Sequence, residues 1–127
     1  MALSTPQRVI TLTINGTDSN SQVYYTYTSP VTGSAFINAP LCDMVCNRSV
    51  NSMFVLDYMS SLNGWTITGT SPNQSPALEF ELGPKGQSVM TINPYDKLDT
   101  YNFYINYKNV ITEAKFASDP QERNVPN

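Results

Sequence analysis

Short runs of β-branched and aromatic residues recur along the whole chain, and this pattern constrains the fold more than any other feature. The runs are rich in Val, Ile, Thr, Tyr and Phe and are divided by Gly, Pro, Asn and Ser, which is typical of strands joined by turns. In the first run, Ile10, Leu12 and Ile14 fall on one face of a strand and the intervening threonines on the other. The runs predict strands at residues 9–15, 23–28, 34–37, 53–58, 65–68, 78–82, 89–92, 101–107 and 111–116.

No window of the chain combines a helical period with caps, so we expect an all-β protein. About nine short strands at this spacing predict a single-domain antiparallel β-sandwich. A chain of 127 residues is long enough to bury roughly two-thirds of its unfolded surface. We place the sandwich in residues 1–117 and treat residues 118–127, which are polar and interrupted by proline, as a C-terminal tail.

The composition excludes several classes of chemistry. Only 13% of the residues are charged, the net charge is −3, and the chain has no histidine. Without histidine there is no Ser-His-Asp or Cys-His catalytic arrangement and no histidine metal site. The acidic balance and the lack of a Lys/Arg cluster argue against nucleic acid or an anionic membrane as a partner. Catalysis must rest on carboxylates, Lys, Tyr, Ser/Thr or Cys, and we expect no cofactor.

Neither the cysteines nor the hydropathy pattern indicates an oxidising compartment or a membrane anchor. Cys42 and Cys46 have no other soft ligands nearby in sequence, so we expect two reduced, partly buried thiols and no metal site. A disulfide would need the segment to curl back on itself. No stretch approaches the roughly 20 apolar residues of a membrane span, and the first residues lack the features of a signal peptide. We expect a cytoplasmic protein, unless it leaves by a route that uses no signal.

Three aspartates in the middle of the chain are candidates for a site. Asp57 interrupts an otherwise apolar strand, where a buried carboxylate is costly unless it is paired or hydrogen-bonded. The alternative is a partly exposed side chain on the outer face. Asp96 and Asp99 flank Lys97 and could contact a cation, but a hard-cation site normally needs six or more oxygens, so a solvated turn is the simpler interpretation.

The Asp119-Pro120 peptide bond, near the C-terminus, points most directly to chemistry. The aspartate carboxylate can reach its own main-chain carbonyl and close a five-membered cyclic anhydride. The tertiary amide nitrogen of proline is more basic than an ordinary amide nitrogen and departs more readily once protonated. Proline also biases residue 119 toward extended backbone. The bond is therefore a candidate for self-cleavage, and the alternative is a turn that ends the last strand.

Three segments, taken in order, resemble a known family. They are residues 64–69 (Gly-Trp-Thr-Ile-Thr-Gly), 101–109 (Tyr-Asn-Phe-Tyr-Ile-Asn-Tyr-Lys-Asn) and 118–126 (Ser-Asp-Pro-Gln-Glu-Arg-Asn-Val-Pro). Together they resemble the DP-EP family, small bacterial proteins long treated as a domain of unknown function. The resemblance implies a β-sandwich that cleaves itself after the aspartate of Asp-Pro. One departure is that the family name points to a second acidic-Pro pair, whereas here Val125 precedes Pro126.

The chemistry that the resemblance implies can be assigned to residues of this chain. Asp119 would act, ionised, as an internal nucleophile, or would direct a water at its own carbonyl. Its placement favours attack, because well-oriented intramolecular groups reach effective molarities of about 10⁵–10⁸ M. A second group must protonate the Pro120 nitrogen, and without histidine we expect a carboxylic acid with a raised pKa. Asp57 is the first candidate for this acid or for a water-activating base, followed by Glu79 and Glu81.

The family is also described as using a lysine to capture the aspartyl group, which gives an amide cross-link within one chain or between chains. Such a lysine must be deprotonated to attack, and desolvation favours that state. Lys97 lies in a loop and best suits the position of the family's acceptor lysine. Lys108 and Lys115 are the alternatives, although Lys115 lies on the strand that leads into Asp119, from which reaching back is awkward.

Three functions remain open. The first is a self-processing endopeptidase that leaves a main fragment ending at Asp119 and releases residues 120–127. The second is an assembly module that partners with itself, its C-terminal segment adding a strand to a neighbour. The third is a small-molecule or carbohydrate-binding sandwich that uses exposed tyrosines and Trp65, although a tryptophan after a tight turn more often packs in the core. The first two are compatible, since a cross-linking tail would lock an assembly.

Overall fold

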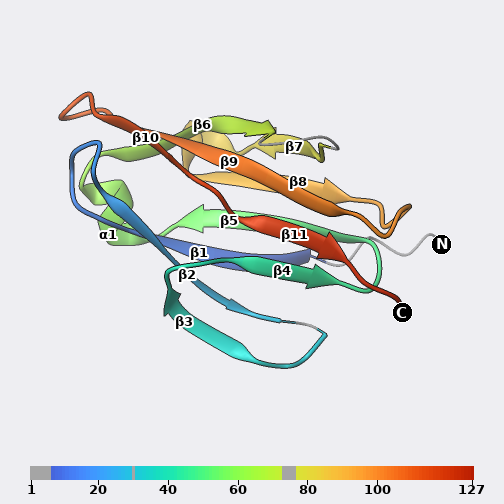
Figure 1. Cartoon of the computed structure of the whole chain (residues 1–127). Helices are drawn as coiled ribbons and strands as arrows, with labels where there is room; N and C mark the ends of the chain where they lie inside the picture. Colours follow the sequence, from blue (N-terminus) through green and yellow to red (C-terminus); the bar gives the residue numbers. More distant parts are fainter. Residues whose placement is uncertain (1–6, 30, 73–76) are drawn as a thin grey trace.

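The computed structural model describes residues 7–29, 31–72 and 77–127 (Figure 1). The protein is all-β, and the described residues form eleven strands with one short α-helix and one 3-10 turn. The strands are β1 (Gln7–Asn15), β2 (Gln22–Thr28), β3 (Ala35–Ala39), β4 (Asp43–Cys46), β5 (Val50–Leu56), β6 (Trp65–Pro72), β7 (Glu79–Leu82), β8 (Ser88–Asn93), β9 (Thr100–Asn109), β10 (Lys115–Ser118) and β11 (Gln121–Asn124). The helix α1 is Tyr58–Leu62 and the 3-10 turn is Pro84–Gly86.

The strands form two mixed sheets. The first is six-stranded, in the order β3-β2-β1-β5-β8-β7. In the second, β9 pairs with β6, with β10 and with β11, and β11 also pairs with β4. Two pairs are parallel, β1 with β5 and β4 with β11, so the expectation of purely antiparallel sheets is wrong at these two places. Parallel neighbours need long crossover connections, which a strand pattern does not reveal.

The buried faces of the two sheets share one hydrophobic core. Phe54 of β5 meets Phe103 of β9 edge to face across the sheets, with ring centroids 5.9 Å apart. Alternate side chains of the strands point into this core, where Ile10, Leu12 and Phe54 are fully buried. Trp65 is also fully buried and its indole N–H donates to the Gly16 carbonyl at 2.9 Å, so it is a core residue and not an exposed binding surface.

Several expectations fail at places where burial or pairing, and not the local pattern, sets the structure. Residues 57 and 58 do not continue β5, because α1 begins directly after Asp57. Residues 111–114 belong to the turn between β9 and β10, so the last predicted strand starts later, at Lys115. Residues 78–82 alternate apolar and acidic side chains, which predicts an inward apolar face, but β7 is an edge strand and its Phe80 and Leu82 are 43% and 47% exposed.

The C-terminal residues set apart as a tail contain an integral strand. Strand β11 lies between β9 and β4, where Figure 1 shows it in red. The two cysteines are free, as expected, and they are more fully buried than expected. Within the described part of the chain, no helix is long and apolar enough to cross a membrane.

Candidate functional site

The Asp119-Pro120 bond lies in the middle of what is geometrically one strand. Ser118 of β10 pairs with Ile105 of β9, and Gln121 of β11 pairs with Asn102 of β9. These two pairings share a single register, so β10 and β11 follow the same edge of β9. The opposite edge of β9 is occupied by β6. Proline interrupts the ladder because it has no N–H to donate.

The main chain around this bond is fixed on both sides. The Phe103 amide donates to the Pro120 carbonyl at 3.5 Å, and the Gln121 amide donates to the Cys42 carbonyl at 2.9 Å. Backbone groups of successive residues point to opposite sides of a strand. The Asp119 carbonyl therefore points away from β9. Strand β4, which pairs with β11 on that side, begins only at Asp43, opposite Gln121. Pro120 is buried against the core and the Asp119 side chain is exposed.

The Asp119 side chain opens onto a groove of about 320 Å³ between β2 and β10. Tyr24, Tyr25 and Pro40 line one side of this groove, and Ser118 and Asp119 line the other. The hydroxyls of Ser118 and Tyr107 lie 2.8 Å apart. Ser118 therefore lines the groove beside the Asp-Pro bond, and the buried Tyr107 hydroxyl supports it from the interior.

Tyr25 is the tyrosine whose environment ties it most closely to this bond. Burial raises its pKa, a hydrogen bond with Ser118 lowers it, and the nearby Cys42 and Asp119 raise it further. The net shift is upward, so the Tyr25 hydroxyl stays protonated at neutral pH. The groove thus presents a neutral hydrogen-bond donor on the same side as the Asp119 carboxylate.

Asp57 does not lie in this site. It is the N-cap of α1, where its carboxylate accepts a hydrogen bond from the Ser60 amide at 2.8 Å and one from the Thr13 hydroxyl at 2.7 Å. Burial raises its pKa, but the hydrogen bonds from Ser60 and Thr13 outweigh burial and lower it. A lowered pKa favours the ionised carboxylate, so Asp57 does not suit the role of proton donor. It also does not line the groove beside Asp119, where a water-activating base would have to lie.

The two glutamates proposed as alternatives are also remote from the bond. Glu79 and Glu81 are exposed on β7, at one edge of the six-stranded sheet, whereas the groove contains β2 residues near the other edge. Four strand spacings separate β7 from β2, which is about 19 Å at ~4.8 Å per strand. The structure therefore does not bring these carboxylates to Asp119.

The candidate acceptor lysines do not reach Asp119 within one chain. The Lys97 carbonyl accepts a hydrogen bond from the Asn124 side chain at 2.8 Å, which places Lys97 beside the far end of β11. Asn124 is five residues beyond Asp119, or about 16 Å along an extended strand. Lys115 and Lys108 pair with each other at the far end of β10, about 13 Å from Asp119 on the same measure.

Glu122 is the buried acidic residue that the sequence reasoning missed. Its side chain is 0% exposed and accepts hydrogen bonds from the Thr91 hydroxyl and from the Asn93 amide group. Burial raises its pKa, while Thr91, the charge of Arg8 and Asn93 act in the opposite direction without cancelling it. The surrounding sequence, Gln-Glu-Arg-Asn, is polar at every position, so no alternation marks this strand or its buried side.

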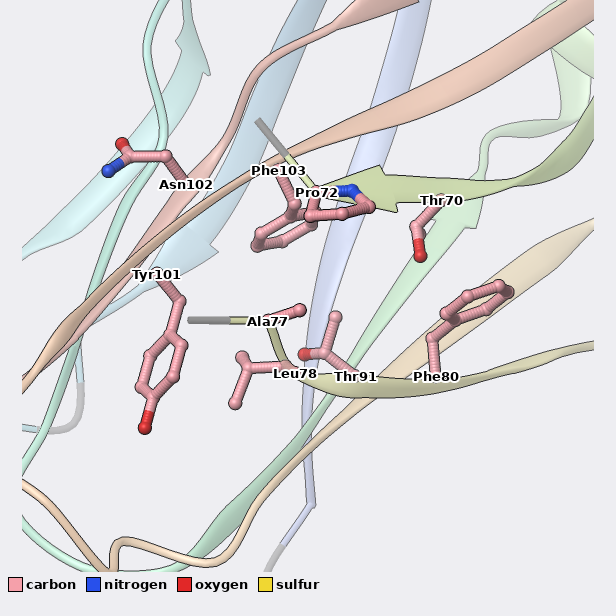
Figure 2. Close-up of a pocket in the computed structure, with 9 residues that line it drawn as sticks. All are labelled: Thr70, Pro72, Ala77, Leu78, Phe80, Thr91, Tyr101, Asn102 and Phe103. Atoms are coloured by element: carbon pink, nitrogen blue, oxygen red, sulfur yellow. The ribbon is translucent and has the colours of Figure 1, made fainter. Parts of the chain in front are cut away.

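A second cavity lies between β6, β7 and β9 and is shown in Figure 2. It encloses about 160 Å³, and its walls are mainly apolar, with Leu78 and Phe80 facing Phe103 across the space. Thr91 contributes a hydroxyl to its lining, and this hydroxyl already donates to Glu122. No group of three or more His, Cys, Asp or Glu residues with the geometry of a metal site occurs within the described ranges.

A scan against protein-family models finds no match for this chain, and a search of curated proteins finds none with significant similarity. The function is therefore inferred from the geometry of the Asp119-Pro120 segment.

Proposed function

We propose that this protein is a single-turnover endopeptidase that cleaves its own Asp119-Pro120 bond. The observation that carries the proposal is the placement of this bond, which is held extended between two segments paired to β9 while the Asp119 carboxylate is exposed in a groove. Such fixation holds the target carbonyl in one orientation beside the Asp119 side chain, which favours a high effective molarity. The proposal agrees with what the resemblance to the DP-EP family implies.

The reaction needs only the aspartate, a proton donor and water. An Asp119 carboxylate oxygen bonds to the main-chain carbonyl carbon of Asp119, and the bond from that carbon to the Pro120 nitrogen breaks as the nitrogen takes up a proton. Water then opens the cyclic anhydride, giving its hydroxyl to a carbonyl carbon and releasing a proton. Asp119 is left as the C-terminal residue of the main fragment with both carboxyl groups free.

We assign the proton donor to the hydroxyl cluster at the groove in place of Asp57. Ser118 adjoins Asp119 in the chain, and Tyr25 faces both residues from β2. Tyr25 is hydrogen-bonded to Ser118 and its raised pKa disfavours a phenolate, so the phenol relays a proton through Ser118 while it takes up another from the groove. A lysine that captures the aspartyl group instead of water would come from a second copy. Lys97 is exposed, so its side chain is accessible to another molecule.

The test is to incubate the purified full chain for days and to measure its intact mass under denaturing conditions. We expect a species lacking residues 120–127 in the natural protein and none in Asp119→Ala. Tyr25→Phe should slow its appearance by about 10²-fold, the usual contribution of a general acid, whereas the matched Tyr24→Phe should not. A dimer that survives denaturation would indicate transfer to a lysine. A single unchanged full-length mass across pH would end this proposal.

A second candidate function, an assembly module without catalytic activity, is favoured by an exposed apolar cluster at one end of the molecule. Tyr58, Met59 and Leu62 of α1 and Val110 and Ile111 of the β9–β10 turn are each 58–76% exposed. The turn is tied to the end of α1, since the Val110 amide donates to the Gly64 carbonyl at 2.8 Å. Leu62→Ser with Ile111→Ser should then reduce self-association measured by light scattering, and Asp119→Ala should leave it unchanged.

A further inference from the structure

We infer that the channel between β9 and β4 is a strand-binding site for the segment 120–127. This segment occupies the site within its own chain, and after cleavage it remains bound as a separate peptide that can exchange with the same segment of a second copy. Self-cleavage of the Asp119-Pro120 bond rests on the proposed function, but the binding site does not depend on how that bond is broken.

Main-chain hydrogen bonds hold the segment on both sides. On the β4 side, the Gln121 amide donates to the Cys42 carbonyl at 2.9 Å and the Val125 amide donates to the Cys46 carbonyl at 2.8 Å. On the other side, β11 pairs with the start of β9, and the Asn124 amide donates to the Asp99 carbonyl at 2.9 Å. These bonds do not pass through the Asp119-Pro120 link, so a cut there leaves them in place.

Two side chains of the segment enter buried polar positions. Glu122 accepts hydrogen bonds from Thr91 and Asn93, and the Asn93 amide group also donates to the Asn124 side chain at 2.8 Å. Asn124 in turn donates to the Lys97 carbonyl at 2.8 Å. Removing the segment would leave Thr91 and Asn93 without these partners, and unpaired buried polar groups are costly. The site therefore selects a peptide with Glu and Asn two residues apart.

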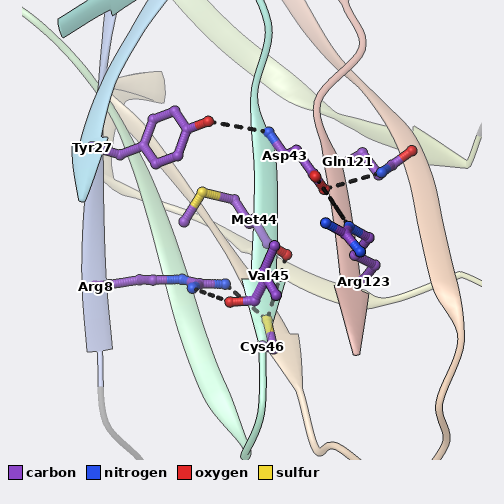
Figure 3. Close-up of polar contacts among 8 residues, drawn as sticks. All are labelled: Arg8, Tyr27, Asp43, Met44, Val45, Cys46, Gln121 and Arg123. Atoms are coloured by element: carbon purple, nitrogen blue, oxygen red, sulfur yellow. Dashed lines mark hydrogen bonds and ion pairs between the residues drawn. The ribbon is translucent and has the colours of Figure 1, made fainter. Parts of the chain in front are cut away.

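The outward side chains of the segment add contacts to β4. Figure 3 shows Gln121 and Arg123 meeting the same carboxylate of Asp43, with the Gln121 amide group at 3.0 Å and the Arg123 guanidinium at 3.0 Å. Both partners of the Asp43–Arg123 pair are partly exposed, so this pair contributes less than the buried contacts. On the side of β4 away from β11, Arg8 donates to the Val45 carbonyl at 3.1 Å and to the Cys46 thiol.

The segment has the properties of an exchangeable strand. It pairs through a short strand of four residues, and a cut at Pro120 removes its covalent link to the preceding strands. Addition of a strand to an open site is a recognised mode of peptide binding, in which main-chain bonds supply affinity and alternate side chains supply specificity. A second copy carries the same Glu and Asn at the same spacing, so its segment is the partner that this site fits.

The experiment uses the full chain with a short protease recognition sequence inserted between Ser118 and Asp119 and cut after folding. Circular dichroism before the cut confirms that the insertion is tolerated. We expect the peptide beginning at the cut to co-elute with the body on native gel filtration. A synthetic peptide of residues 120–127, labelled at Asn127, should then exchange into the cut protein, measured by fluorescence anisotropy.

Peptide variants give the matched comparison. Glu122→Lys should weaken exchange at least tenfold, because it places a second cation near Arg8 in a buried site, while Pro126→Ala, at an exposed position, should bind as the natural peptide does. Loss of the peptide from a body that stays folded, or equal binding by Glu122→Lys, would overturn the inference. Exchange in the cut protein without any self-cleavage of the natural chain would overturn the proposed function and leave this inference standing.

Discussion

Glu122 is a fully buried carboxyl group whose pKa is raised by its burial. It lies at the contact between the sheets, where Thr91 and Asn93 of β8 satisfy its oxygens. The positive charge of Arg8 in β1 lowers the pKa of Glu122, and Arg8 itself donates to the Ser52 hydroxyl at 3.0 Å. Because burial dominates, the folded state favours the protonated carboxyl, so the charge of Glu122 at neutral pH opposes folding.

Glu122 should make the natural protein more stable as the pH falls below neutrality. A folded-state pKa above the unfolded value of about 4.3 adds stability that is fully present below pH 4.3 and is lost as pH rises through the folded value. In Glu122→Gln this contribution disappears, so the free energy of unfolding should rise less than in the natural protein as the pH falls through the folded value toward about 4.3. Urea unfolding at several pH values measures it, and identical pH dependence in both proteins would contradict the burial of this carboxyl.

At the scale of elements, β10 and β11 share one register along β9 but are separated by the Asp119-Pro120 bond. A proline in a ladder normally marks an edge or a bulge, yet here the strand resumes and becomes internal, with β4 on its other side. The reactive bond is thereby placed between two anchored segments, and cleavage would divide one strand without dissolving the sheet.

The short helix α1 depends on its cap. Asp57→Ala removes the acceptor for the Ser60 amide and the Thr13 hydroxyl, so we expect destabilisation of about 0.5–2 kcal/mol in urea unfolding. Asp57→Asn keeps a capping oxygen and should lose much less. Since the pKa of Asp57 is lowered on folding, its contribution is present above about pH 3.9 and is lost as pH falls through the folded value.

The same two variants separate capping from catalysis. If Asp57 only caps α1, both variants should process the Asp119-Pro120 bond at the natural rate when compared under conditions where they are folded. A rate loss in folded Asp57→Asn, measured by intact mass, would restore Asp57 as a participant in cleavage.

At the scale of the whole molecule, a cut at residue 119 converts a unimolecular fold into a two-part assembly. Its stability should then depend on free peptide, because a ligand that binds the folded state stabilises it by RT ln(1 + [L]/Kd). In the cut protein, each tenfold increase in added peptide of residues 120–127 should raise the free energy of unfolding by about 1.4 kcal/mol once the site is saturated.

Differential scanning calorimetry across peptide and protein concentrations gives this measurement. The Tm of the cut protein should rise with either concentration, whereas the Tm of the uncut chain should be independent of both. If the Tm of the cut protein does not change with peptide concentration, β11 is dispensable for folding.

The all-β class, most strand positions and the inward faces of strands such as β1 and β9 can be predicted from the amino-acid sequence alone. These follow from a period of two residues, which is a local property of the chain. The reactivity of the Asp119-Pro120 bond is local in the same sense, because it depends on two adjacent side chains. No alternation marks β4, where Asp43 is followed by three apolar residues, or β11, which is polar at every position.

Contacts between residues far apart in the chain become visible in the folded structure. It made Asp57 a helix cap, placed Tyr25 and Ser118 beside Asp119, and moved Lys97 to the far end of β11. It also buried Glu122 and turned the supposed tail into an internal strand. Strand order, parallel pairing and burial depend on contacts between segments far apart in sequence, so a local pattern does not contain them.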